Sequence, residues 1–439
     1  MTRALKSLLL PALCAGALLD FSAVARAADV TPAPAPAPAN WWDTLTVGGS
    51  VQAGILFNPD SPPDGLNFGH LYTDRANTPV LNSVLLTIQR PIDPKATDYD
   101  VGFKVQVQYG SDARFNHYLG ELDYAINDIS QIAPIEAWGM LHTPWLFSGG
   151  IDIKAGQWVS LLGAETIDPT TNFLYSHSYM YNFGVPFLET GVMTISHVDP
   201  MVDIYAGISS GVNTTFGGVN NARPAFEGGI GLNLFDGNLT VLAITHIGPE
   251  NPNTPLGIAA CGGCNPNDTL RFFNDVVTTW KVTDSLTLIT DMNFVHDDSL
   301  QQSGYGVAQY GIYTVNNWLK LVGRAEVWRD NSNFYVAAFP GNFDAVNAAH
   351  GFPSNAIFAP APTTYFEVTA GLNLAPPIPD GTPVLKTLTF RPEFRYDTSL
   401  NGTTPFRGSN GLFGPGTPGF GVGTKSSQIT FGGDVIATF

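Results

Sequence analysis

The chain closes on SQITFGGDVIATF, residues 427–439, in which apolar and polar side chains alternate. Only Ile436 interrupts this order. A period of two predicts a β-strand whose two faces meet different environments. The apolar face carries Ile429, Phe431, Val435, Ala437 and Phe439, and the other face carries Gln428, Thr430, Asp434 and Thr438.

A terminal aromatic residue, Phe439, ends this strand, and no helix-forming segment follows that could cover its apolar face. The ending resembles that of bacterial outer-membrane barrels, and the resemblance implies recognition by the barrel-assembly machinery. The alternative is the last strand of a soluble β-sandwich. The rest of the chain favours the barrel.

The N-terminus reads as a secretory signal peptide at residues 1–27. Arg3 and Lys6 precede an apolar stretch, and small residues flank the position after Ala27. Cys14 follows a leucine rather than a small residue, so no lipid anchor is expected. Residues 28–43 form a spacer containing TPAPAPAPA, which is extended and unable to enter a sheet. This spacer is either a disordered tail or a tether to the cell wall.

The mature chain is strongly acidic. Removing residues 1–27 takes three bases and one acid from 20 Lys+Arg and 37 Asp+Glu, which leaves a net charge of −19. This argues against a nucleic-acid partner. It favours cations in a channel, although bases facing inward could reverse the preference. After the signal no run of about 18 apolar residues occurs, so any membrane-spanning structure must be a closed barrel.

Strand candidates fill residues 44–439. The sequence predicts an all-β fold, a transmembrane antiparallel β-barrel of about 16 strands with a long constriction-type loop after strand 5. Long and short connections alternate, as in bacterial barrels with short periplasmic turns and long outer loops. The strands are expected to begin near 44, 80, 99, 133, 147, 188, 201, 225, 238, 270, 285, 305, 318, 364, 386 and 427.

The charged faces of these strands should point into a water-filled lumen, since the opposite faces are apolar. The predicted pore-lining residues on strands are Lys104, Lys154, Lys320, Arg324, Glu326, Arg391, Glu393, Arg395 and Asp397. Aromatic rings should form a girdle at the periplasmic strand ends. These rings are Trp42, Trp145, Phe235, Trp280, Trp318 and Phe439.

Residues 156–191, GQWVSLLGAETIDPTTNFLYSHSYMYNFGVPFLETG, resemble the putative outer-membrane beta-barrel porin family described as OmpL-like. Fainter echoes lie at 136–138, at 391–397 and in the last strand. Two positions depart from the family pattern as we know it: His177 stands in place of an arginine and Glu189 in place of a histidine. The matching positions are Gly156, Gln157, Trp158, Gly163, Glu165, Asn172, Tyr175, Ser176, Ser178, Tyr179, Pro186, Phe187, Thr190 and Gly191.

The segment 159–187 joins the fifth and sixth strands, and this position resembles that of the inward-folding loop of general diffusion porins. Such a loop would carry Glu165 and Asp168, and Glu189 beside it, toward the bases of the lumen wall. Opposed charges across a pore select permeants by charge and dipole. In the alternative, 159–187 is an outer loop whose acids are merely solvated.

Cys261 and Cys264 should close a small disulfide, because the compartment is oxidising. A redox role would need a strand-to-helix junction, and zinc would need two more ligands, so no metal is expected. His177 and Ser178 are the only tempting hydrolase pair, but neighbours on an extended chain point apart, so no enzyme is expected. Asp297 with Asp298, and the acids of 60–64, are either solvated or calcium-binding.

These arguments favour a porin for passive diffusion of small hydrophilic solutes and ions, with no cofactor. Expected partners are outer-membrane lipid and lipopolysaccharide, and a homotrimer is expected by resemblance alone. The competing hypothesis is a structural or adhesive barrel plugged by its own loops, with 329–363 meeting a partner.

Overall fold

The computed structural model describes residues 41–93, 96–215, 223–299, 301–379, 381–382, 384–408, 419–420 and 423–439. The signal peptide expected at 1–27 and most of the spacer expected at 28–43 lie outside the described residues, so those boundaries stay predictions. Before the first strand a short 3-10 helix, η1 (Trp41–Thr44), sets Trp41 against Trp42.

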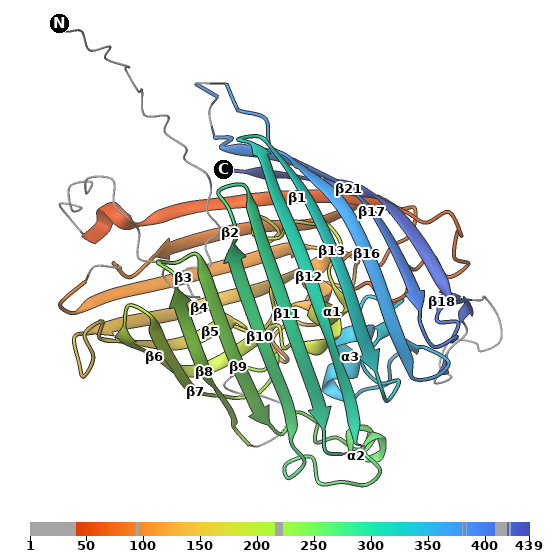
Figure 1. The fold of residues 1–439 in the computed structure, drawn as a ribbon. Helices are drawn as coiled ribbons and strands as arrows, with labels where there is room; N and C mark the ends of the chain where they lie inside the picture. The colour runs from red at the N-terminus through yellow and green to blue at the C-terminus, as the bar shows by residue number, and fades with distance from the viewer. Residues whose placement is uncertain are drawn as a thin grey trace, which may run out of the picture.

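A closed antiparallel barrel of sixteen strands dominates the structure (Figure 1). The last strand pairs with the first, Ser50 to Phe57 against Phe431 to Thr438, so the sheet has no free edge. The barrel strands are β1 (Thr46–Phe57), β2 (Val80–Arg90), β3 (Asp100–Gly110), β4 (Gln131–Thr143), β5 (Ile151–Val159), β6 (Leu188–Asp199), β7 (Val202–Ser209), β8 (Ala225–Leu234), β9 (Leu239–Gly248), β10 (Arg271–Lys281), β11 (Leu286–Asp297), β12 (Gln302–Asn316), β13 (Leu319–Asp330), β16 (Thr363–Leu374), β17 (Thr387–Ser399) and β21 (Ser427–Thr438).

The predicted fold class and strand count are thus confirmed, and every predicted strand start lies within four residues of the observed one. Short elements occupy the long connections: η2 (Asp112–Phe115), α1 (Tyr179–Gly184), α2 (Pro255–Ala260), α3 (Asp344–His350), β14 (Ala337–Ala338), β15 (Ile357–Phe358), β18 (Phe406–Gly408), β19 (Gly419–Phe420) and β20 (Gly423–Lys425). Among the described residues, no helix has the length and apolar character needed to cross a membrane.

The long connections all leave one end of the barrel. We number those used below as loop 1 (58–79), loop 2 (111–130), loop 3 (160–187), loop 5 (249–270), loop 7 (331–362) and loop 8 (400–426). The opposite end carries only short turns and both ends of the barrel chain, and Phe439 pairs there with Gly49 through two backbone hydrogen bonds of 3.0 Å. The predicted aromatic girdle lies at this end, where Trp42, Trp145 and Trp280 are exposed.

The strand faces alternate as the sequence predicts. In β3, Val105 and Val107 are exposed while Gln106 and Gln108 are buried, so the apolar face points outward. Ile436 breaks the pattern of the last strand because it faces inward, where it is 3% exposed. The outer wall is therefore apolar and the inner wall polar, the arrangement of a barrel in lipid.

The lumen contains a packed apolar cluster, contributed by five loops together with wall residues. Leu66 of loop 1, Tyr118 of loop 2, Tyr179 of loop 3, Val336 of loop 7 and Phe406 of loop 8 all belong to it. Each of these five side chains is almost fully buried. The described parts of these five loops thus reach into the mouth of the barrel.

Candidate functional site

Loop 3 enters the barrel after β5 and reaches the opposite wall. In the closed order of sixteen strands β13 lies eight positions from β5, which is half the circumference. The loop meets this wall first at β10 and β11, where Gly163 N–H donates to Asp275 at 3.0 Å and Ala164 N–H donates to Asp291 at 2.9 Å. Figure 1 shows α1, which belongs to loop 3, inside the ring of strands.

Glu165 is the next anchor. Its Oε1 accepts hydrogen bonds from Arg324 Nη1 at 2.6 Å and from the Tyr310 hydroxyl at 3.0 Å. Its Oε2 lies 2.9 Å from His177 Nδ1 and accepts the Ser178 N–H at 3.0 Å. Burial alone would raise the pKa of Glu165, but the positive charge of Arg324 and these hydrogen bonds outweigh it and lower that pKa to about 2.

Arg324 is shared between the loop and the wall. Its Nε donates to Glu367 at 2.5 Å, and its Nη1 also donates to the Ser176 carbonyl at 2.8 Å. The guanidinium is almost fully buried. Three partners in different directions hold it in one position, which fixes loop 3 against β13 and β16.

The arginines of β17 hold the loop backbone in the same way. Arg391 donates to the Asn172 carbonyl at 2.5 Å and pairs with Asp434 of β21. Arg395 donates to the His177 carbonyl at 2.5 Å and pairs with Asp397 at 2.8 Å. Both guanidiniums are thereby neutralised by carboxylates of the wall itself.

Two wall carboxylates accept backbone N–H groups of loop 3. Glu393 accepts from Tyr175 at 2.8 Å and from Ser176 at 3.1 Å. Glu326 accepts from Tyr179 at 2.7 Å and from Met180 at 2.8 Å, at the start of α1. These donors are neutral groups, so the carboxylates are hydrogen-bonded without being charge-neutralised.

The ring of Tyr175 packs where β1 has no side chain. A Cβ built on Gly54 would lie 2.5 Å from this ring, so only glycine leaves room for it. The Tyr175 hydroxyl donates to Asn82 of β2 at 2.9 Å. Loop 3 therefore touches the wall from β10 around to β2, while loop 2 contacts the other side, where the Tyr118 hydroxyl donates to the Ile135 carbonyl of β4 at 3.0 Å.

Asp168 does not reach a wall base. Its Oδ1 accepts the backbone N–H of Thr170 at 3.0 Å and its hydroxyl at 2.7 Å, which closes a local turn. The carboxyl is half-buried. Lys320 of β13 lies over the ring of Phe173, 5.8 Å from the ring centre.

Lys104 and Lys154 stand on the wall that loop 3 leaves uncovered. Lys104 forms an ion pair with Glu136 of β4. The Lys154 ammonium lies over the faces of Trp138 and Trp158, 4.8 Å and 5.4 Å from the ring centres. The structure thus separates the predicted bases into two groups, and Glu165 touches Arg324 directly instead of facing it across a gap.

Sequence reasoning missed several of the charged residues of this wall, including Glu136, Asp275, Asp291, Glu367 and Asp434. The signal available was their inward register on strands, which is strongest for Asp434 in the alternating last strand. Among the described residues the buried charged side chains on barrel strands comprise thirteen carboxyls and five bases. They are Glu136, Asp152, Glu189, Glu227, Asp275, Asp291, Asp297, Glu326, Asp330, Glu367, Glu393, Asp397 and Asp434, and Arg90, Lys154, Arg324, Arg391 and Arg395.

Loops 2 and 7 contact each other at the loop end of the barrel. His350 Nε2 lies 2.6 Å from Asp123, and the Tyr124 hydroxyl donates to Asn347 at 2.8 Å. Burial would raise the pKa of Asp123, but the hydrogen bond with His350 and the N–H of Gly120 lower it. Loop 7 is therefore fastened to loop 2 by two side-chain hydrogen bonds.

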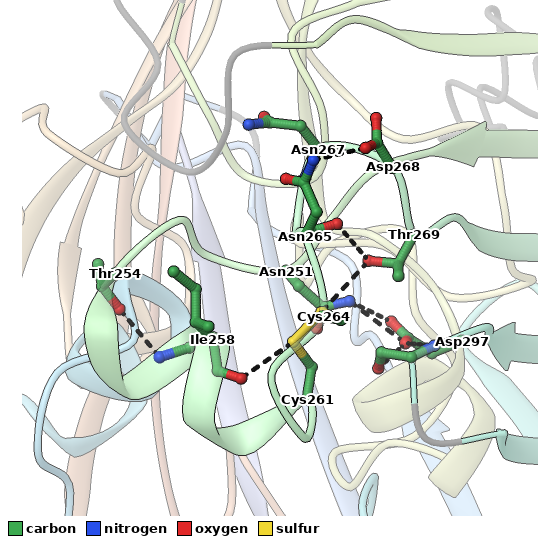
Figure 2. The surroundings of a disulfide bond; sticks show 12 residues. Asn251, Thr254, Ile258, Cys261, Cys264, Asn265, Asn267, Asp268, Thr269 and Asp297 are labelled. Atoms are coloured by element: carbon green, nitrogen blue, oxygen red, sulfur yellow. Dashed lines mark hydrogen bonds between the residues drawn. A yellow bond between two sulfur atoms is a disulfide. The ribbon is translucent and has the colours of Figure 1, made fainter.

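A disulfide joins Cys261 and Cys264 at the C-terminal end of α2 in loop 5 (Figure 2). Thr254 caps the start of this helix, since its hydroxyl accepts the Gly257 N–H at 3.0 Å. The same hydroxyl donates to the Gly351 carbonyl of loop 7 at 3.0 Å. The disulfide thus closes a small turn at the rim, next to the contact between loops 5 and 7.

The pair His177 and Ser178 has structural partners. The Ser178 hydroxyl accepts the Tyr181 N–H at 3.0 Å and caps α1, while His177 Nδ1 faces Glu165. Glu189 of β6 pairs with His246 of β9, whose Nδ1 lies 3.0 Å from the Glu189 carboxyl. Within the described part of the chain no cluster of three or more His, Cys, Asp or Glu side chains has the geometry to hold a metal ion.

Solved outer-membrane proteins share this architecture. The outer membrane channel DcaP of Acinetobacter baumannii is 14% identical, with 90% of this chain and 97% of that chain covered and a TM-score of 0.51. The anion-selective porin from Comamonas acidovorans is 8% identical, with 90% and 99% covered and a TM-score of 0.52. At such identities the likeness shows the barrel fold alone.

No curated protein sequence matches the chain. The profile of one family, described as "Putative beta-barrel porin-2, OmpL-like", matches residues 44–439, which is the whole barrel. The resemblance drawn from residues 156–191 is thereby confirmed. The chain belongs to this OmpL-like porin family of outer-membrane β-barrels.

Proposed function

We propose that the chain forms a narrow outer-membrane channel for passive diffusion of small hydrophilic solutes and ions, with loop 3 setting its narrowest part. The observation that carries the proposal is the course of loop 3, which crosses from β5 to the opposite wall and is anchored there by carboxyls. A barrel of this strand number encloses an aqueous space that such a loop narrows. Passage needs no cofactor, energy input or chemical conversion.

The permeation path runs between loop 3 and the β3 to β9 wall. On that side Lys104 and Trp138 retain partial exposure, whereas Arg324 and Arg395 beneath the loop do not. Lys104 is therefore the charged group that a permeant meets directly, with its ion-pair partner Glu136 buried behind it. Glu165 and Asp168 act on the loop side, the first by anchoring and the second by its own charge.

Export and assembly follow the usual route of such barrels. Residues 1–27 direct the chain through the periplasm, and Phe439 is the recognition residue for the barrel-assembly machinery. The apolar outer wall contacts lipid and, at the loop end, lipopolysaccharide. We propose a homotrimer, which native electrophoresis and crosslinking of the purified protein would test.

A second candidate function is a plugged structural or adhesive barrel. The apolar cluster formed by loops 1, 2, 3, 7 and 8 favours it, because packed apolar side chains exclude water from the mouth. Such a barrel would present loops 2 and 7 to a partner and conduct poorly. The two candidates differ in one measurable property, which is conductance.

The deciding experiment is to reconstitute residues 28–439 in planar bilayers and record single channels. Stable conductance steps support the porin. Their absence from protein shown to be folded by heat-modifiable migration would favour the plugged barrel.

The role of loop 3 can be tested with one introduced thiol. The mature chain has only the paired Cys261 and Cys264, so Asp168→Cys provides a single reactive site. A bulky methanethiosulfonate reagent should lower the conductance of Asp168→Cys and leave that of Asp284→Cys, in a short turn, unchanged. Equal conductance of the modified and unmodified Asp168→Cys channel would place the narrowest part elsewhere.

A further inference from the structure

Two side-chain amides lie on the outer wall at a depth where lipid would be expected. Gln309 is exposed and is the eighth of the fifteen residues of β12, so it lies midway between the two ends of the barrel. Asn274 is also exposed and is the fourth of the eleven residues of β10, counted from the loop end. A wall that meets only hydrocarbon is apolar at such depths, because an amide loses its hydrogen bonds there. The outward face of β3 follows this rule with Val101, Phe103, Val105 and Val107.

Threonines join the two amides into one patch on β9 to β12. The Thr290 hydroxyl donates to Gln309 Oε1 at 2.7 Å, and the Thr245 hydroxyl donates to Asn274 Oδ1 at 2.9 Å. Thr278 connects the two pairs, since it is paired with Thr290 in the sheet and shares the outward face of β10 with Asn274. We call Thr245, Asn274, Thr278, Thr290 and Gln309 the polar patch.

The N–H groups of the two amides are used differently. Gln309 Nε2 donates to the carbonyls of Ile289 at 2.9 Å and Tyr310 at 3.0 Å. Asn274 Nδ2 has no hydrogen-bond partner among the described residues. Acyl chains offer no acceptor to such a donor, whereas a second protein surface does. The polar patch therefore favours protein over lipid as its neighbour.

A groove adjoins the polar patch on the same side of the barrel, which is the near side in Figure 1. Its volume is about 420 Å³. Gly323 lies between the groove and the patch, since it is paired with Ala370 on one side and with Gly311 of β12 on the other. A Cβ at Gly323 would meet only the Thr369 carbonyl oxygen, at 3.8 Å, so the wall is open outward there. The outward-facing residues that line the groove are Leu321, Ala370, Leu372 and Pro392.

The charge of this face fits a second copy of the chain. The chain carries a net charge of −17, yet neither the polar patch nor the outward-facing lining of the groove contains a charged side chain. Two copies can therefore meet here without like-charge repulsion. An amide offers both a donor and an acceptor, so the amides of one copy can bond those of another.

We infer that the polar patch and the groove form the contact between copies of this chain in the membrane. The inference rests on the proposed homotrimer and names the surface that builds it. In a closed ring each copy turns one continuous face toward its neighbours, and β9 to β17 supply such a face. The inner sides of β10, β11, β13 and β17 anchor loop 3, so the contact braces the half of the barrel that holds the loop.

The test compares two outward-facing strand glycines. Gly323→Phe places a ring on the inferred contact. Gly139→Phe does the same on β4, seven strands away in the closed order, where a Cβ would meet nothing within 4 Å. The mass of each protein in mild detergent is measured by light scattering, with the detergent subtracted. The wild type and Gly139→Phe should give a whole multiple of the chain mass. Gly323→Phe should weaken association by roughly five- to hundredfold, the usual effect of overpacking a packed surface.

A monomeric wild type, a Gly323→Phe protein as fully assembled as Gly139→Phe, or a complex containing a second kind of protein would each overturn the inference. Heat-modifiable migration shows that each variant is folded. If Gly323→Phe does not fold, Asn274→Leu replaces it. Leucine suits lipid, so assembly of Asn274→Leu equal to that of the wild type would overturn the inference, and weaker assembly would support it.

Single-channel recordings of the same preparations separate this inference from the channel itself. Conductance steps from a monomeric wild type would overturn the contact and the homotrimer and leave the porin standing. The absence of steps from an assembled, folded wild type would overturn the porin and leave the contact standing.

Discussion

Glu165 of loop 3 and Arg324 of β13 are 159 residues apart in the chain, yet their carboxylate and guanidinium meet at 2.6 Å inside the lumen. The arginine is also bonded to Glu367 of β16, so one side chain links the loop to two strands. A buried pair of this kind is costly to break from one side, because the remaining charge has no partner.

Replacing Arg324 by methionine should therefore release loop 3. Glu165 would keep only His177 beside it, and Glu367 only Arg395 at 3.7 Å, so two buried carboxylates would lose their nearest base, a loss of about 3–5 kcal/mol by the usual behaviour of buried pairs. We expect a larger single-channel conductance with more current noise. The temperature at which the protein changes from folded to unfolded migration in electrophoresis should fall. Glu165→Gln should be milder, since its amide oxygen can still accept from Arg324. If Arg324→Met channels have the conductance and the current noise of the wild type, Arg324 does not anchor loop 3.

Acid should weaken the same contact in a defined pH window. Because the pKa of Glu165 is lowered from its ordinary 4.5 to about 2, the carboxylate stabilises the fold fully above pH 4.5 and loses this effect as pH falls toward 2. The difference is on the order of 3 kcal/mol. As the pH falls over this interval, the unfolding temperature of the wild type should drop more steeply than that of Glu165→Gln. Parallel curves would show that Glu165 is not the responsible group.

Gly54 of β1 should help to position loop 3 through Tyr175. A Cβ there would meet the Tyr175 ring at 2.5 Å, so Gly54→Ala should displace the ring and break its hydrogen bond to Asn82. Gly311→Ala is a matched control, because its Cβ would meet only Leu288, at 3.9 Å. Conductance should change in the first variant alone. The same value in both would mean that Tyr175 does not help to hold loop 3.

Removing the disulfide should affect the rim and spare the pore. The bond between Cys261 and Cys264 closes a very short loop, so its entropic contribution is at most about 2 kcal/mol. Cys261→Ser with Cys264→Ser should leave conductance and selectivity unchanged and increase proteolysis of loop 5. A clear change in conductance would instead tie loop 5, through its contact with loop 7, to the permeation path.

Phe439 should have two separable roles. Its backbone pairs with Gly49 whatever the side chain, while its ring packs where a Cβ on Gly49 would be only 2.9 Å away. Phe439→Ala should refold in detergent nearly as well as the wild type but reach the outer membrane in smaller amounts. Comparing in vitro refolding with outer-membrane yield checks this. Equal losses in both would assign Phe439 to stability rather than to recognition.

The barrel could be predicted from sequence because each strand separates lipid from the polar lumen, and this contrast leaves an alternating pattern in consecutive residues. Even Ile436, the exception, kept the register and simply faces inward. The strand near 270 alternates poorly, because polar Asn274 faces outward next to Asp275, which faces inward. Asp275, one of the wall carboxyls that hold loop 3, was therefore not predicted from the sequence.

The partners of loop 3 could not be predicted in the same way. Which wall residue meets Glu165 depends on the barrel diameter and on the path of the loop, and neither leaves a local pattern. The sequence also gives no sign that Glu326 and Glu393 accept backbone N–H groups, because any residue other than proline can supply that donor. The expectation of acids facing bases across a gap therefore missed the direct contacts.

The anchoring of loop 3 through main-chain donors has a consequence for how such a protein can diversify. Glu393 and Glu326 accept the main-chain N–H groups of Tyr175 and Met180, so these two hydrogen bonds do not depend on side-chain chemistry, and proline alone would remove the donor. Substitutions in the loop can therefore alter what passes without rebuilding the wall that holds it. The barrel wall can therefore be kept constant while the sequence of loop 3 is varied to change the pore.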